Sequence, residues 1–209
     1  MAYTNRDKYI NLLKESLKKH MKVIRDFKPV ENGFVYTGTR TAINKTEQIP
    51  INYLCGRVWF GLIISWQYIK LPKAKKETLA PFVSLPFFAS KKDDDGRMIP
   101  IFRAEWDSYI QENNKHPQPH WHFTHVNSLY DVLYPDFDQV VGEWDMLLLD
   151  EYKAMMEEMP IHRMHFTMSE KWEEGEEMIS AVPEPNKLAL WITHLLRHVE
   201  TEIKFVMNE

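Results

Sequence analysis

The stretch Phe82-Val-Ser-Leu-Pro-Phe-Phe-Ala-Ser-Lys-Lys-Asp-Asp-Asp-Gly-Arg-Met-Ile-Pro-Ile-Phe-Arg-Ala-Glu-Trp106 predicts two β-strands joined by a hairpin. Residues 82–89 and 98–106 are rich in β-branched and aromatic side chains, which favour strands. Between them, Asp95-Gly96 is a strong signal for a tight hairpin turn. The fold is therefore expected to contain an antiparallel sheet.

Helical periodicity flanks these strands on both sides. Residues 6–27 and 186–207 repeat apolar side chains at helical spacing. Further strands are expected at 34–39, 49–54 and 58–66, and further helices at 126–133 and 143–159. This order predicts an α+β fold with an N-terminal helix, an antiparallel β-sheet meander and C-terminal helices. Residues 1–209 are expected to form a single domain.

Composition excludes several classes of protein. Hydrophobic residues make up 44% of the 209 residues, enough for a core and too many for a disordered chain. The net charge of −4 lacks the overall basic character of a nucleic-acid binder. The most apolar run, 58–69, is shorter than the roughly 20 residues that a membrane helix needs. No membrane partner is therefore expected, and the single Cys55 predicts a reducing, cytoplasmic location.

Polar residues cluster where the second hairpin strand ends. Arg103, Glu105 and Asp107 alternate along that strand, and His120 and His122 alternate along a short segment beyond a polar loop. Side chains two residues apart lie on the same face of a strand. If the two segments pair, facing side chains have Cβ atoms about 5 Å apart. We therefore expect Arg103, Glu105, His120 and His122 to share one face of adjacent antiparallel strands.

Imidazole beside carboxylate suits acid–base catalysis. His122 would be the general base, with His120 or His165 as the acid. Glu105 would orient an imidazole, and Arg103 would bind an anionic oxygen. The alternative interpretation is that His-x-His is the hydrated face of a half-exposed strand.

The same residues also suit a metal site. His120, His122 and a carboxylate, with Asp107 as the candidate, would hold a divalent ion such as zinc or manganese and leave one position open. A second histidine pair, His194 and His198, lies one helical turn apart, but surface positions of a helix explain that spacing better than a metal site does.

Two tripeptides, His122-Phe-Thr124 and His165-Phe-Thr167, resemble the paired His-x-Thr motifs of the two-histidine phosphoesterases. The resemblance implies that each histidine transfers a proton and each hydroxyl helps to hold phosphate. This chain shows no duplicated helix–strand lobe, although that family has one.

The string Arg103-x-Glu105-Trp-Asp107, followed by His116-Pro and His120-Trp-His122-Phe, resembles a pattern in small uncharacterised bacterial proteins. Some of them are grouped with toxin–antitoxin or defence operons. The resemblance implies a bacterial source and nominates five residues: Arg103, Glu105, Asp107, His120 and His122.

The order of elements also resembles a ubiquitin-conjugating fold, including the dipeptide His116-Pro117. Gln118 replaces that family's asparagine and no cysteine follows. The resemblance therefore implies binding without thioester chemistry.

These patterns predict a hydrolase with a His/acid pocket that acts on a phosphodiester, either RNA or a small molecule. The alternative is a non-catalytic interaction subunit of a defence or toxin–antitoxin system, in which the histidine cluster is structural and a protein is the partner. A cluster that solvent reaches favours the enzyme. Buried histidines bonded to backbone favour the interaction subunit.

Overall fold

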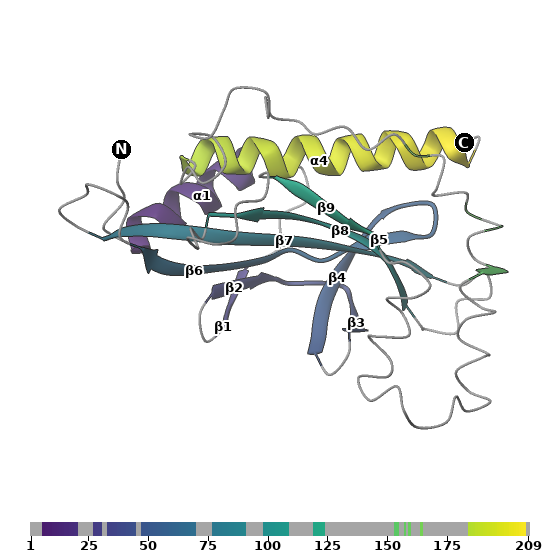
Figure 1. Ribbon diagram of the computed structural model, residues 1–209, viewed down its shortest axis with the longest axis horizontal. Helices are drawn as coiled ribbons and strands as arrows, with labels where there is room; N and C mark the ends of the chain where they lie inside the picture. Colours follow the sequence, from purple (N-terminus) through teal and green to yellow (C-terminus); the bar gives the residue numbers. More distant parts are fainter. Residues whose placement is uncertain are drawn as a thin grey trace.

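The computed structural model describes residues 6–20, 27–30, 33–44, 47–69, 77–90, 98–108, 119–123, 153–154, 157, 159, 164 and 184–207. They form a mixed α+β structure with one helix near each end and a curled, mostly antiparallel sheet between them (Figure 1). The α+β fold class predicted from the sequence is confirmed. The elements are α1 (Arg6–His20), β1 (Phe27–Val30), β2 (Gly33–Tyr36), β3 (Arg40–Asn44), β4 (Glu47–Cys55), β5 (Val58–Phe60), β6 (Ile63–Ile69), β7 (Thr78–Ser90), β8 (Met98–Asp107), β9 (His120–Phe123) and α4 (Pro185–Val206).

Strand β7 organises the sheet. Along one of its edges, β6 pairs with residues 78–84 and β5 pairs with residues 87–89, while β8 pairs along the other edge. Strand β9 continues the sheet beyond β8. The predicted antiparallel pairing of 82–89 with 98–106 is confirmed.

Residues 58–66, predicted as one strand, form the separate strands β5 and β6 because the chain breaks at Gly61. The Gly61 N–H donates to the Pro86 carbonyl at 2.9 Å, which brings the break close against β7. A Cβ atom at position 61 would lie 2.8 Å from Ile49 Cγ2 and 3.2 Å from Pro86 Cγ. Glycine therefore fits at this break in the chain, whereas a larger residue would have to displace its neighbours.

Helices α1 and α4 pack together over one face of the sheet and enclose the main core (Figure 1). The Trp191 ring of α4 meets Trp106 of β8 edge-on, with centroids 5.5 Å apart. Leu195 and Val199 are buried in the same core. The helix predicted from the apolar periodicity of residues 186–207 is thus confirmed, and its apolar side packs on the core.

The opposite face of the sheet carries Glu105, since Ile63, Ser84 and Glu105 are register neighbours across β6, β7 and β8. Ile63 packs there against a smaller core that β3, β4 and β7 build: Ala42, Ile49, Ile51 and Phe88. Strands β3 and β4 thus cover part of this face.

Several element boundaries differ from the prediction. Helix α1 ends at His20, and Phe27, predicted as its last residue, begins β1 and packs its ring on Tyr36. Strands β1 and β3 were not predicted. The predicted helix at 126–133 and most of that at 143–159 lie outside the described residues. Among the described helices, none has both the length and the apolarity needed to cross a membrane.

Candidate metal centre

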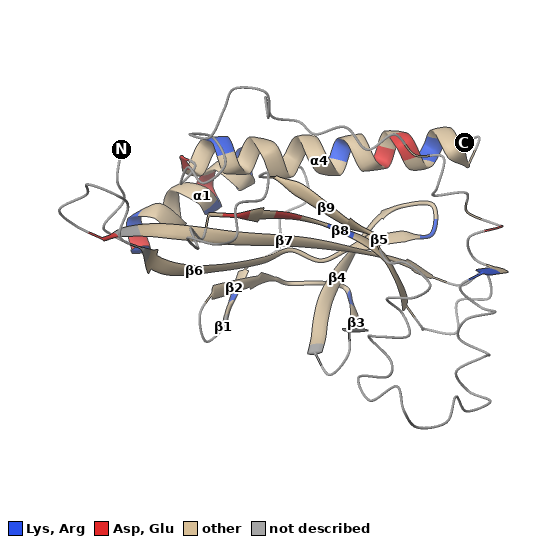
Figure 2. Ribbon diagram, viewed as in Figure 1, with Lys and Arg blue, Asp and Glu red and all other residues tan. Residues whose placement is uncertain are grey.

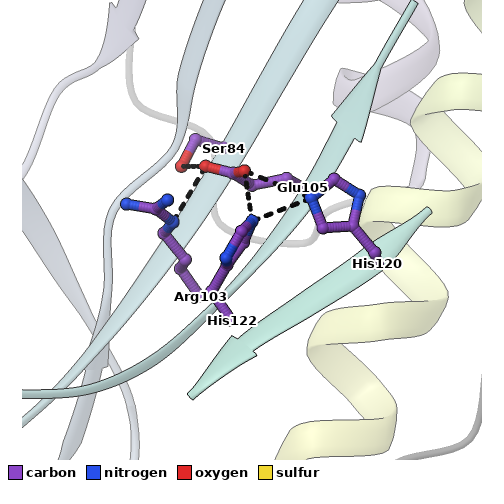
Figure 3. Close-up of polar contacts among 5 residues, drawn as sticks. All are labelled: Ser84, Arg103, Glu105, His120 and His122. Atoms are coloured by element: carbon purple, nitrogen blue, oxygen red, sulfur yellow. Dashed lines mark hydrogen bonds and ion pairs between the residues drawn. The ribbon is translucent and has the colours of Figure 1, made fainter. Parts of the chain in front are cut away.

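The pairing of β8 with β9 assembles the site. Arg103 lies opposite His122 and Glu105 lies opposite His120 in the register. The side chains of Arg103, His120 and His122 all approach the Glu105 carboxylate (Figure 3). The prediction that these four residues share one sheet face is confirmed. Trp121 and Phe123, which alternate with the histidines, pack their rings on Phe102 instead.

Three atoms converge at the centre of this cluster. Glu105 Oε2 lies 2.8 Å from His122 Nε2 and 3.5 Å from His120 Nε2. The two Nε2 atoms are themselves 2.8 Å apart. One oxygen and two nitrogens, each a metal-ligating atom type, therefore face a single point.

Hydrogen bonds cannot account for all three of these contacts at once. A neutral imidazole carries a proton on only one nitrogen. If the His122 Nε2–H donates to Glu105 Oε2, that nitrogen has no lone pair left to accept a hydrogen bond from His120. A cation at the centre would instead accept all three lone pairs at once.

The spacing of the three atoms is close to that of a metal site. In a tetrahedral zinc site with ligand distances of about 2.0–2.2 Å, neighbouring ligand atoms lie about 3.3–3.6 Å apart. The His120–Glu105 separation of 3.5 Å matches this spacing. The two 2.8 Å separations would have to widen by about 0.5–0.8 Å around a zinc ion.

Burial and charge set the protonation states that a metal needs. Burial raises the pKa of Glu105, but the hydrogen bond with His120 and the positive charge of Arg103 outweigh it, so the pKa is lowered. Burial lowers the pKa of His122 more than the nearby Glu105 carboxylate raises it. At neutral pH the carboxylate is therefore ionised and the His122 ring neutral, which are the forms that coordinate metal.

The other carboxylate oxygen, Glu105 Oε1, is held by protein groups. Arg103 Nε lies 2.9 Å from it, and the Ser84 hydroxyl donates to it at 3.4 Å (Figure 3). Sequence reasoning did not identify Ser84 as a site residue. The available signal was a polar residue within the apolar strand 82–89.

The carboxylate that lies with His120 and His122 is that of Glu105, whereas the sequence had suggested Asp107. Within the described residues, Glu105, His120 and His122 form a group whose ligand atoms all lie within 4.8 Å, and Asp107 does not belong to it. Asp107 lies opposite Phe82 in the register, past the last β8–β9 pair at Glu105. The β8–β9 register thus decides between the two carboxylates.

The remaining sequence candidates divide into two groups. His116, Thr124 and His165 lie outside the described residues. His194 and His198 lie on α4, and among the described residues they belong to no three-ligand group.

The cluster is charged and lies on strands that carry few charges (Figure 2). The Glu105 side chain is only 9% exposed, whereas the side chains of Arg103 and His122 are 46% and 43% exposed. Solvent therefore reaches the arginine and one imidazole, while the carboxylate that joins them is shielded.

No family model, curated protein or solved structure matches this chain. Its function is inferred from the chemistry of the site.

Proposed function

We propose that this chain is a metal-dependent phosphodiester hydrolase in which Glu105, His120 and His122 hold a divalent cation such as zinc or manganese. The observation that carries the proposal is the convergence of two imidazole nitrogens and one carboxylate oxygen within 4.8 Å. Two histidines and one glutamate are the ligand set of hydrolytic zinc sites that keep a position open.

A divalent cation in this position would supply a Lewis acid and lower the pKa of a water molecule. The protein would supply the rest of the chemistry. Glu105 adds negative charge that retains the cation, and its burial keeps competing water away from the carboxylate. The half-exposed Arg103 offers N–H donors beyond the one on Nε, in a planar fork that suits phosphoryl oxygens.

The substrate class follows from this pairing of positive charges. A cation and a guanidinium side by side favour a substrate with an anionic oxygen, and both RNA and small phosphodiesters carry one. A bacterial, cytoplasmic setting belongs to the same proposal, in keeping with Cys55, a buried cysteine that is not in a disulfide.

Metal analysis combined with hydrolysis assays tests the proposal. The purified chain would be analysed for bound metal and assayed with bis(p-nitrophenyl) phosphate and a short RNA, with and without a chelator. We expect stoichiometric zinc or manganese and activity that the chelator removes. Glu105→Gln and His122→Ala should lose both, while His194→Ala, an exposed histidine on α4, should keep both.

The other outcomes are equally specific. Hydrolysis by metal-free protein would replace the proposal with acid–base catalysis, in which His122 acts as the base oriented by Glu105. Neither metal nor hydrolysis would overturn the enzyme and favour the non-catalytic interaction subunit with a protein partner.

A further inference from the structure

We infer that Ser84 and Arg103 are positioning residues that keep Glu105 a one-oxygen metal ligand, so that the cation retains an open position. The inference rests on the proposed function, because it concerns the same site. It assigns a role to Ser84 and adds a second role to Arg103.

The two oxygens of Glu105 have separate partners. Oε2 faces the two histidines, whereas Oε1 accepts the hydrogen bond from Ser84 Oγ at 3.4 Å and contacts Arg103 Nε at 2.9 Å. The carboxylate is thus divided into an oxygen for the metal and an oxygen for the protein.

The sheet fixes this division. Ser84 of β7 lies directly opposite Glu105 of β8, so that its hydroxyl projects onto the same face. Both residues are buried, at 8% and 7% exposure. A buried carboxylate oxygen without a protein donor costs free energy, so the contacts to Ser84 and Arg103 resist rotation of the carboxylate.

Rotation would change the chemistry of the site. A carboxylate that offers both oxygens can chelate the cation and occupy the position that water or substrate needs. Groups behind the metal ligands orient them in this way, and their removal typically weakens metal binding about 10- to 100-fold. One oxygen and two imidazoles also disfavour Ca²⁺, which takes about six to eight oxygen ligands.

Cobalt binding to the full chain tests the inference, because the visible absorption of Co²⁺ reports its coordination number. The metal-free protein would be titrated with Co²⁺ and, in competition, with Zn²⁺. The variants are Ser84→Ala, Ser84→Thr and Arg103→Lys, which keeps the charge but loses the Nε donor. The matched control is Ser90→Ala, a buried serine of the same strand that donates to the Arg57 carbonyl at 3.5 Å.

We expect the wild type to show the intense absorption of four-coordinate Co²⁺. Ser84→Ala and Arg103→Lys should bind about 10-fold or more weakly, with the fainter spectrum of higher coordination. Ser84→Thr should restore both properties, and Ser90→Ala should resemble the wild type.

Different results would contradict the positioning role and the metal site. Wild-type affinity and spectrum in both Ser84→Ala and Arg103→Lys would overturn the positioning role and leave the metal site standing. A wild-type chain that binds neither Co²⁺ nor Zn²⁺ would overturn the proposed function itself, and the positioning role with it.

Discussion

Glu105 is the residue on which the whole site depends. It contacts one side chain from β7, one from its own strand and two from β9. Three of these partners, Arg103, His120 and His122, are at least partly exposed, while Glu105 itself is buried. Loss of the carboxylate should therefore affect more of the structure than loss of either imidazole.

Stability measurements on the metal-free protein test this asymmetry. His122→Ala removes a half-exposed ring and should change the free energy of unfolding by about 1 kcal/mol or less. Glu105→Gln leaves several donors with a poorer acceptor and should cost about 1–3 kcal/mol. Urea denaturation would measure both values. A larger loss for His122→Ala than for Glu105→Gln would show that the imidazole, and not the carboxylate, holds the cluster together.

The titration of His122 gives a pH prediction of definite sign. Folding lowers the pKa of His122, so as the pH falls below the usual value of about 6.5 the unfolded chain takes up its proton first. The contribution of His122 to stability is thus complete above that pH and is lost as the pH falls through the folded pKa. The lowered pKa of Glu105 acts in the same direction at lower pH.

We therefore expect the metal-free wild type to lose stability between pH 7 and pH 5, and His122→Ala to lose less over the same interval. Urea titrations of both proteins across this range would measure the difference. Parallel pH curves for the two proteins would contradict the assignment.

At the scale of elements, the sequence shows which side chains share a face of a strand. It does not show which residues of two paired strands lie opposite each other. Period-2 spacing was enough to place Arg103 with Glu105, and His120 with His122, on matching faces. The choice between Glu105 and Asp107 depends on which residue of β8 faces His120, and the length of the intervening loop does not reveal that. Ser84 could not be assigned because its role exists only through pairing with β8.

The break between β5 and β6 was missed for a related reason. Apart from Gly61 and Ser65, residues 58–66 are apolar and favour strands, so local propensity predicts one strand. The interruption at Gly61 comes from the approach of Ile49 and Pro86, which are distant in sequence. Tertiary packing overrides propensity at that residue.

Helix α4 offers a matched pair of neighbours for testing its packing. Leu195 is buried in the main core, at 4% exposure, whereas the adjacent His194 faces solvent. Leu195→Ala should cost about 2–5 kcal/mol because it leaves a cavity between the helix and its neighbours. His194→Ala should stay within about 0.5 kcal/mol of the wild type. Thermal or urea denaturation would measure both, and equal losses would contradict the observed orientation of α4.

At the scale of the whole molecule, the two faces of the sheet carry different groups of residues. The helix-covered face contains the main core, whereas the face with Glu105 carries the smaller core and the site. Because most buried apolar side chains lie under the helices, the fold should tolerate changes at the site. Metal binding should then stabilise the folded state without being required for folding, so that the metal-free chain still folds.

That coupling gives a prediction for the intact protein. The three ligands come from two strands, and the geometry that joins them is lost on unfolding, so a cation that binds them must stabilise the folded state. Zinc at 100 times its dissociation constant should add about 2.7 kcal/mol to the free energy of unfolding, and a chelator should remove this gain. Urea denaturation with and without zinc would measure it, with His122→Ala expected to lose the gain and His198→Ala, on α4, expected to keep it. An equal zinc effect in both variants would place the bound ion elsewhere, and no effect in the wild type would mean that the cluster does not bind zinc.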